Sequence, residues 1–481
     1  MDQKIHRDDY RKRASMRRRQ YLLHRLPLIL IIILLLALLI TFCWMLGQHF
    51  LGKDRLSLPS SASTAPSDPI NLEPSTRIEI STEPEPTMDP GVEAVLAEAD
   101  RLAVGYDYDG AIEHLQASAF YGSSSEVDEA IQKYEEIRAS LKPCDISQIT
   151  HVFFHTLVMD EAKAFDGDED EKGYNQVMTT KDEFLKILDS MYERGFVLVR
   201  LHDMAELVTT EEGTKMTRKE ILLPEGKKPF VMSQDDVCYY EYMTGDGFAT
   251  RMVVGEDGKP TCEMLMDDGS TQRGAFDLVP ILEEYIQEHP DFSYKGARAV
   301  IAFTGYQGIL GYRTALSYSD SPTYERDRQT AAEVAQCLRD NGWELASHSW
   351  GHRDLGKVSW DNFKADCDKW ENEVESLIGP TDIILFPFGA DVGDWHPYQD
   401  DNERFRYLKS LGFSYFCNVD SSQYWVQVGK DFLRQGRRNL DGFRMWKDIE
   451  AGPGSDSRKL DDLFTAEDVF SPNRPTPVLW E

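Results

Sequence analysis

Residues 324–352 read YERDRQTAAEVAQCLRDNGWELASHSWGH, and this stretch places a helix directly before a strand. Within residues 324–341, the apolar residues Tyr324, Ala331, Val334, Ala335 and Leu338 recur at spacings of three, four and seven positions, which are the spacings of one face of an amphipathic helix. Trp343–Ser347 is then a short apolar run of strand length, and it ends at His348. An amphipathic helix followed by a buried strand is the unit from which parallel sheets are built.

The same alternation runs in both directions from this stretch, from about residue 149 onward. The apolar runs that predict strands are Val152–Val158, Phe196–Leu201, Phe230–Ser233, Ala299–Phe303, Trp343–Ser347, Ile383–Phe386 and Phe413–Cys417. The segments that predict helices include Lys181–Arg194, Asp277–Glu288, Tyr324–Asn341, Trp360–Ile378 and Asn402–Leu411.

About seven such units in a domain spanning residues 149–450 suit a barrel better than an open sheet. The predicted fold class is therefore α/β, with a distorted (β/α) barrel of about seven strands. Within this domain, residues 241–275 are acidic and glycine-rich and predict an insertion near the barrel mouth. Residues 451–481 are expected to form a C-terminal tail.

The first 50 residues predict a basic cytoplasmic tail and a membrane anchor. The run from Leu26 to Leu46 is apolar, with Pro27 and Thr41 as mild interruptions, and about 20 residues suffice to cross a bilayer as a helix. Lys and Arg residues precede the run, so the positive-inside rule places the N-terminus in the cytoplasm. The run is too long for a signal peptide. We therefore expect a single-pass cell-membrane protein whose remaining residues are extracytoplasmic.

Two further segments separate the anchor from the barrel. Residues 51–90 are rich in Ser, Thr, Pro and Glu and predict a disordered tether. Residues 91–142 have helical periodicity and predict a small helical module. Its Gly105-Tyr106-Asp107-Tyr108 turn resembles that of one tetratricopeptide repeat, and a single repeat cannot form a solenoid. A packing role is favoured over the binding of a protein partner.

Composition narrows the classes of partner. The chain has 83 acidic and 52 basic residues and a formal net charge of -31, which would repel phosphate backbones and argues against nucleic-acid binding. Of seven cysteines, six lie outside the apolar run and none forms a CxxC pair. We interpret them as small buried apolar residues rather than as disulfide partners.

Polar residues follow three of the predicted strands, at the ends where catalytic groups sit in a (β/α) barrel. These residues are Asp235-Asp236 after the strand that begins at residue 230, His348 with His352 after residue 347, and Pro387-Phe388-Gly389 after residue 386. His155 lies inside the first predicted strand.

This combination of residues is typical of a metal hydrolase. Two histidines four positions apart on a helical turn point to one side and can share an ion. One carboxylate completes a His₂Asp set with open positions for water and substrate, and the adjacent carboxylate can serve as a general base. Each pair alone is weak evidence. Asp-Asp pairs also occur elsewhere in the chain, and two histidines at this spacing are as often a surface or core pair as a metal site. Their shared position at one rim favours the metal site.

The motif order resembles that of polysaccharide deacetylases, the NodB-homology superfamily of carbohydrate esterase family 4. The resemblance covers roughly residues 149–450. It implies that Asp235 is the catalytic base and that Asp236, His348 and His352 bind a divalent metal, usually zinc. It also implies a hydrolase that removes N-acetyl groups from an extracytoplasmic polysaccharide, either peptidoglycan or an exopolysaccharide. The residues expected to contact that substrate are Pro387, Phe388, Gly389, Trp395 and Trp425, although both tryptophans suit a core role equally well.

The sequence departs from the family pattern in three places. Gln234 stands where the family has Phe, Leu385 stands where an Arg braces the base, and no Leu-x-His motif follows near the C-terminus. The circularly permuted branch of poly-N-acetylglucosamine deacetylases, in which a histidine-bearing strand comes first, resolves the last departure. Residues 152–157 resemble that strand, and residues 386–389 are close to its Trp-Pro-Tyr-Gly motif.

By this resemblance His155 is the expected general acid. A nearby carboxylate would keep it protonated, and Asp160 is the candidate in sequence; His396 is the next histidine to consider as the acid. Two other hypotheses stay open. The missing Arg and displaced acid suit a catalytically inactive glycan-binding pseudoenzyme. Alternatively, the helical module is the active part of a cell-surface scaffold.

Overall fold

Seven parallel strands close into a barrel in the computed structural model of the chain. The structure describes residues 88–480, except 212, 394–395 and 421–423. In ring order the strands are β2 (Thr150–Phe154), β7 (Lys228–Gln234), β11 (Val300–Phe303), β12 (Glu344–Ser347), β13 (Ile383–Leu385), β14 (Tyr415–Val419) and β16 (Leu433–Asn439). The pairing of β16 with β2 closes the ring. All seven carboxyl ends therefore meet at one rim.

The predicted seven-stranded barrel is confirmed, with one exchange of strands. Six predicted strands belong to the ring. The segment predicted at residues 196–201 forms β3 (Phe196–Leu198), which pairs with the first half of β7 outside the closed ring. The seventh ring strand is β16, which the apolar pattern misses because its sequence, LRQGRRN, contains three arginines.

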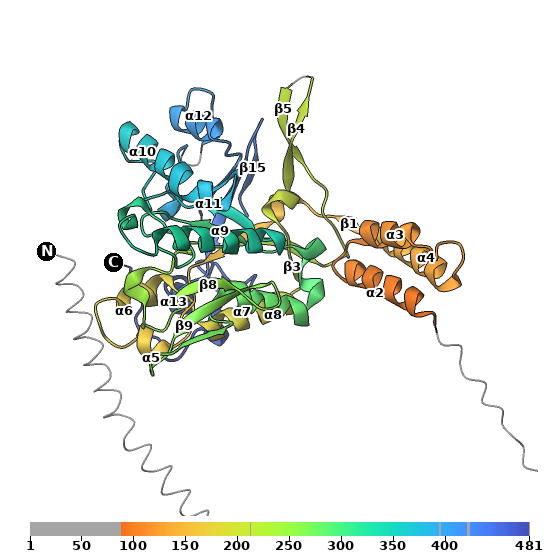
Figure 1. Cartoon of the computed structure of the whole chain (residues 1–481), viewed down its shortest axis with the longest axis horizontal. Coiled ribbons are helices and arrows are strands. Elements are labelled where there is room, and N and C mark those ends of the chain that lie inside the picture. Colours follow the sequence, from red (N-terminus) through yellow and green to blue (C-terminus); the bar gives the residue numbers. More distant parts are fainter. Residues whose placement is uncertain (1–87, 212, 394–395, 421–423, 481) are drawn as a thin grey trace, which may run out of the picture. The chain divides into compact units, whose positions relative to one another are not determined.

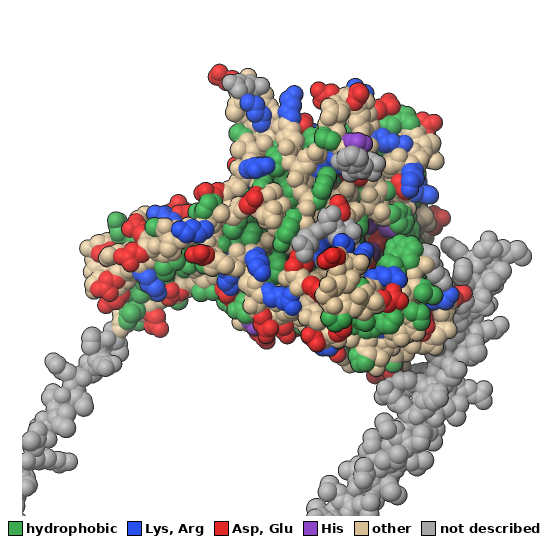
Figure 2. All heavy atoms as spheres, turned by 180° about the vertical axis from the view of Figure 1, so that it is seen from behind, with side chains coloured by type: hydrophobic (Ala, Val, Ile, Leu, Met, Phe, Trp, Pro, Cys, Tyr) green, Lys and Arg blue, Asp and Glu red, His purple; other side chains and the backbone are tan. Residues whose placement is uncertain are grey.

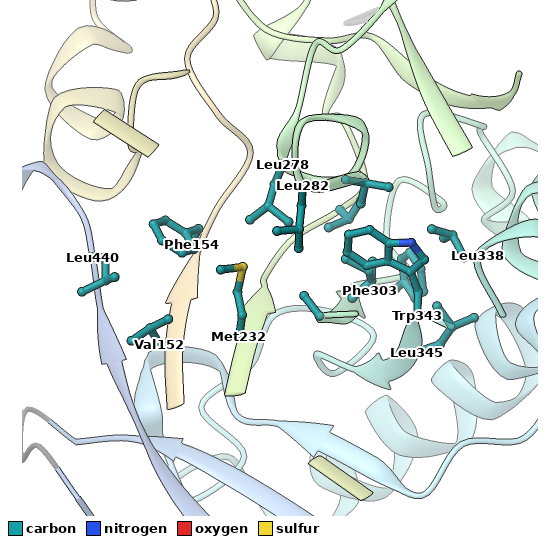
Figure 3. Close-up of a cluster of buried hydrophobic side chains, with 14 of the residues drawn as sticks. Val152, Phe154, Met232, Leu278, Leu282, Phe303, Leu338, Trp343, Leu345 and Leu440 are labelled. Carbon is teal, nitrogen blue, oxygen red and sulfur yellow. The ribbon is translucent and has the colours of Figure 1, made fainter. Parts of the chain in front are cut away.

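Helices cover the outside of the barrel. These are α7 (Lys181–Glu193), α8 (Leu278–Glu288), α9 (Tyr324–Asp340), α10 (Trp360–Trp370), a π-helical turn (Glu371–Glu375), α11 (Ser376–Ile378), α12 (Glu403–Ser410) and α13 (Gly442–Ala451). Figure 3 shows the packing between them and the sheet: Phe154 and Met232 face Leu278 and Leu282 of α8. All four side chains are buried, and each contributes on the order of 1.5–3 kcal/mol by leaving water.

The barrel interior changes from apolar to polar toward the carboxyl ends of the strands. Side chains alternate between the two faces of a strand, so Val231, Ser233 and Asp235 of the β7 segment share the inner face. Likewise Leu433, Gln435 and Arg437 of β16 form an inward row. The first residue of each row lies in a buried apolar cluster, whereas the later ones are buried and polar. This gradient leads to the rim where the candidate site lies.

Smaller elements decorate the barrel. The predicted insertion forms an antiparallel sheet of β8 (Arg251–Val254), β9 (Pro260–Leu265) and β10 (Thr271–Gly274). A hairpin of β4 (Ala205–Thr210) and β5 (Gly213–Arg218) projects from the barrel in Figure 1. The remaining short elements are β1 (Lys142–Pro143), β6 (Leu222–Leu223), β15 (Val426–Val428), α5 (Glu161–Ala164), α6 (Glu171–Val177) and α14 (Ala466–Val469).

The helical module contains α2 (Pro90–Val104), α3 (Tyr108–Ala117) and α4 (Ser125–Ser140). Asp89, Asp107 and Ser124 accept hydrogen bonds from the first turns of these helices, and such caps satisfy otherwise unpaired N–H groups. The module contacts the barrel through an ion pair of Asp107 with Lys295 at 3.1 Å. Tyr106 also donates to the carbonyl of Asp291 at 2.9 Å.

In the predicted C-terminal tail, the described residues 451–480 pack back onto the barrel domain. Arg474 forms an ion pair with Glu183 of α7 at 2.6 Å, and both side chains are fully buried. Glu183 also accepts from the backbone N–H of Ser471. This segment thus holds the start of α7.

The membrane anchor predicted at residues 26–46 and nearly all of the predicted tether lie outside the described residues. Within the described part of the chain, no helix is long and apolar enough to cross a bilayer.

The six cysteines found there are free, and all but Cys144 are buried, as the interpretation without disulfides predicts. Acidic and basic side chains are mixed on the face shown in Figure 2.

Candidate metal centre and active site

Asp236, His348 and His352 come together at the carboxyl rim of the barrel. Asp236 follows β7, while both histidines follow β12. One donor atom from each residue lies within 4.8 Å of the others, and His352 Nε2 lies 3.6 Å from Asp236 Oδ2. Two ligands bound tetrahedrally to zinc are roughly 3.4 Å apart. The donor types and their spacing therefore fit one divalent ion.

His348 is held in the form that a metal ligand requires. Its Nδ1–H donates to the carbonyl of Leu385 at 2.7 Å, so Nε2 is left with its lone pair for an ion. Burial lowers the pKa of His348 to about 4, which keeps the ring neutral near pH 7. A hydrogen bond to the backbone of the neighbouring strand thus fixes both the tautomer and the ring orientation.

The loops that carry these groups have unusual backbone conformations. Asp236 (φ 59°), Ser349 (57°), His352 (49°) and Phe388 (58°) occupy the left-handed region although none is a glycine. Such residues are uncommon and cost free energy unless the surrounding structure imposes them. These four residues all follow β7, β12 or β13. Strained backbone at these three strand ends indicates that the loops are held in conformations that orient the side chains of the site.

Asp235 lies beside the metal-binding group but belongs to a different set of contacts. Its Oδ1 accepts from Nη1 of Arg437 at 2.6 Å, and its Oδ2 lies 3.7 Å from His348 Nε2. Burial would raise the pKa of Asp235, but the positive charge and the hydrogen bond of Arg437 outweigh it, with a smaller contribution from His348 when that ring is protonated, and hold the pKa well below its usual range. Asp235 is therefore an ionised carboxylate with one oxygen turned toward the candidate ion.

Arg437 is a residue of the candidate site that sequence reasoning missed. It is fully buried in β16 and forms an ion pair with Asp235 at 2.6 Å, whereas the resemblance led us to expect an Arg at position 385. Leu385 instead belongs to the apolar inner row of β13. The sequence held one indication of such a residue: Leu385 stands where the resemblance predicts an Arg. A buried carboxylate beside a metal site requires a cation, so that cation had to come from another strand.

The ion pair of Arg437 with Asp235 predicts a large stability effect. Arg437→Met removes one partner of a buried pair, which costs about 3–5 kcal/mol because the other charge is left uncompensated. The Arg437→Met/Asp235→Asn double variant removes both charges and should regain much of that loss. Urea unfolding of the wild type, Arg437→Met, Asp235→Asn and the double variant measures the coupling free energy between the two side chains. Strictly additive effects would show that the two side chains do not interact.

His155 follows β2 directly and lies next to Asp235, since Phe154 is the register partner of Gln234. Its Nδ1 donates to the carbonyl of Val177 at 3.1 Å. A positive charge on His155 would lower the pKa values of Asp235, Asp236 and Asp441, so the ring lies on the side of the candidate site.

Asp160, the carboxylate predicted to assist His155, has another role. Its Oδ1 accepts from the N–H of Ala162 at the start of α5, and its Oδ2 lies 3.6 Å from Lys163 Nζ. The buried Asp441, which follows β16, is a third carboxylate, besides Asp235 and Asp236, whose pKa a positive charge on His155 would lower. Asp441 is 286 positions away in sequence (441 minus 155), so no local pattern links the two.

Gln234 departs from the family pattern for a structural reason. It points away from the barrel interior, and its Nε2 donates to both carboxylate oxygens of Asp277 at 2.9 Å. Asp277 immediately precedes α8 and also accepts from Leu157 N and Tyr239 Oη. Gln234 therefore links β7 to the start of α8 and leaves the orientation of Asp235 unchanged.

The predicted substrate-binding residues divide into three groups. Phe388 is 71% exposed, and its ring lies edge-on to His352 with centroids 4.5 Å apart. The turn of Pro387-Phe388-Gly389 is tight, since a Cβ on Gly389 would lie 2.7 Å from Cβ of Val419. Trp425 packs over the guanidinium of Arg434 at 5.0 Å, and Trp395 lies outside the described residues.

Comparisons with known proteins give limited similarity. No family model matches the chain, and a search of curated proteins finds no match. The deacetylase PplD of Streptococcus pyogenes, solved with acetate, is 12% identical, with 63% of this chain and 94% of that protein covered and a TM-score of 0.32.

A second solved structure, from Bacillus anthracis, is described as that of a polysaccharide deacetylase candidate, BA0330. It is 11% identical, with 62% of this chain and 65% of that protein covered and a TM-score of 0.33. At these identities and TM-scores, neither match establishes the family or the activity of this chain.

Proposed function

We propose that the chain is a metal-dependent hydrolase that removes N-acetyl groups from an extracytoplasmic polysaccharide. The observation that carries the proposal is the joint placement of a His₂Asp group and a separate, Arg-braced carboxylate at one barrel rim. One group of residues can bind the ion, and the separate carboxylate of Asp235 can accept a proton. Hydrolysis of an amide by an activated water requires both functions. The motif resemblance supports the choice of an N-acetylated glycan as substrate.

Each residue has a defined task in the proposed reaction. Asp236, His348 and His352 would hold the ion, and a set of two imidazoles and one carboxylate favours zinc. When bound, the ion supplies positive charge that favours water deprotonation and stabilises an oxyanion. Asp235 accepts the proton of the water whose oxygen bonds to the acetyl carbon. A backbone N–H near Phe388 would add a hydrogen bond to the oxyanion.

His155 completes the proton balance. As the bond between the acetyl carbon and the nitrogen breaks, the leaving nitrogen needs a proton to depart as an amine. His155 would donate that proton, and the products are acetate and a glycan with a free amino group. The carbonyl of Val177 accepts from Nδ1, which leaves Nε2 for this transfer.

The pseudoenzyme hypothesis loses its main support. It rested on the missing Arg at position 385 and on the displaced acid. Arg437 provides a cation at hydrogen-bond distance from Asp235, so the missing Arg at position 385 no longer favours an inactive site. The proposal also includes an extracytoplasmic location for the barrel domain, with residues 26–46 as the membrane anchor.

Acetate release tests the proposed function. The full-length protein, incubated with acetylated chitooligosaccharides, poly-N-acetylglucosamine and peptidoglycan fragments, should release acetate from at least one of them. A chelator should abolish the release, and added Zn²⁺ should restore it. Release that persists unchanged after complete metal removal would argue against the metal-dependent mechanism.

A further inference from the structure

Tyr240 contacts one carboxylate oxygen of the metal ligand Asp236, and His352 lies near the other. Its hydroxyl donates to Asp236 Oδ1 at 2.7 Å. The other carboxylate oxygen, Oδ2, is the one that lies 3.6 Å from His352 Nε2. The two oxygens of Asp236 therefore have different neighbours: Oδ1 accepts from Tyr240, and Oδ2 lies near the donor atom of His352.

The ring of Tyr240 is fixed by a stack of tyrosines. It lies nearly parallel to Tyr306, with centroids 5.2 Å apart, and to Tyr242, at 5.7 Å. Tyr242 is in turn parallel to the buried Tyr174 at 6.3 Å. Tyr240 itself is only 6% exposed. A ring held on both faces cannot swing its hydroxyl away from Asp236 without disturbing the stack.

The hydrogen bonds behind Tyr240 have one consistent direction. An ionised carboxylate can only accept, so Tyr240 gives its proton to Asp236. The hydroxyl of Thr304, 2.7 Å from that of Tyr240, must then donate to the tyrosine oxygen. The thiol of Cys238 donates to the hydroxyl or the carbonyl oxygen of Thr304, at 3.0 and 3.3 Å. Such a chain polarises each donor in the direction of Asp236.

We propose that Tyr240 is a positioning residue for the metal ligand Asp236. It occupies Oδ1 and leaves Oδ2 as the single oxygen that binds the ion. Asp236 then coordinates through one oxygen, which preserves open positions for water and substrate. This inference rests on the metal site of the proposed function and concerns the affinity of that site for its ion.

Zn²⁺ affinity of the full-length protein tests the inference without any need for activity. Tyr240→Phe keeps the ring in the stack but removes the hydroxyl, and it should weaken the Kd for Zn²⁺ by ~10- to 100-fold, the usual effect of losing a group that orients a ligand. Tyr242→Phe is the matched control, because it removes a hydroxyl from the neighbouring ring and leaves the bond from Tyr240 to Asp236 intact. Its Kd should equal that of the wild type.

The outcomes separate this inference from the proposed function. A Tyr240→Phe variant that binds Zn²⁺ as tightly as the wild type would overturn the role of Tyr240 alone. A wild-type protein that binds no Zn²⁺ would overturn the metal site and this inference with it. If Tyr240→Phe does not fold, Thr304→Val takes its place, because it removes the donor to Tyr240; it should weaken Zn²⁺ binding less, and an unchanged Kd would again overturn the proposal.

Discussion

Asp235→Asn is expected to lower the turnover of acetate release by ~10²-fold or more while the protein keeps its metal ion. The amide has the shape of the carboxylate but cannot accept the proton of the attacking water. The metal content should persist because the donor atoms come from Asp236, His348 and His352. Kinetics of acetate release and elemental analysis of the same preparation measure both quantities.

The control for this variant is Asp268→Asn. Asp268 is the second member of an exposed Asp-Asp pair and accepts only a local hydrogen bond from Ser270. Its loss should change neither turnover nor metal content. Loss of the ion in Asp235→Asn would mean that the roles of Asp235 and Asp236 are exchanged, or that both carboxylates bind the metal.

His155→Ala should leave the ion bound and slow turnover by ~10²- to 10⁴-fold, the usual contribution of one acid–base group. Without a proton donor, the leaving nitrogen departs poorly and the reaction reverts to the amide. The defect should therefore be smaller on an acetyl ester, whose leaving oxygen needs less assistance from an acid. Parallel assays on an amide and an ester substrate measure this difference.

Asp160→Ala provides the comparison for His155. Because Asp160 caps α5 rather than contacting His155, its loss should leave turnover within about twofold of the wild type, as for most surface changes. Full activity of His155→Ala would contradict the circular-permutation hypothesis and turn attention to His396.

Most of the barrel could be predicted from the sequence because six of its strands are apolar. Runs such as Ile383–Phe386 and Trp343–Ser347 are buried on both faces, and this property is visible in a single sequence. The helices between them were predicted to within a residue or two because their amphipathic periodicity is also visible in a single sequence. For example, Lys181–Glu193 begins with a capping box at Thr180 and Glu183, which agrees with the periodic pattern.

The strand β16 could not be predicted in this way. Arg434, Arg437 and Arg438 are all nearly inaccessible to solvent, yet arginine in a sequence indicates a surface position. Their burial depends on partners that only the fold supplies: Asp391, Asp235 and Asp462. The apolar segment at residues 196–201 was chosen as a ring strand instead, because hydrophobicity alone does not reveal which edge a strand joins.

The candidate site shows the same division. Polar residues directly after apolar strands are visible in the sequence, so the position of Asp235-Asp236 and of the two histidines at one rim could be predicted from the pattern. The choice of Asp236 as the metal-binding carboxylate came from the family resemblance. The residues that orient them were not visible, since Arg437, Tyr240 and the carbonyl of Leu385 act through distances set by the closed barrel. Orienting contacts of this kind cross strands that are far apart in sequence.

The metal content of the purified full-length protein tests the central claim most directly. Elemental analysis should find about one divalent ion per chain, as one His₂Asp set predicts. His348→Ala and Asp236→Ala should each lose most of that ion, while His289→Ala, which alters a histidine stacked on Tyr285 at the end of α8, should retain it. Full metal occupancy in both His348→Ala and Asp236→Ala would contradict the assignment of the site.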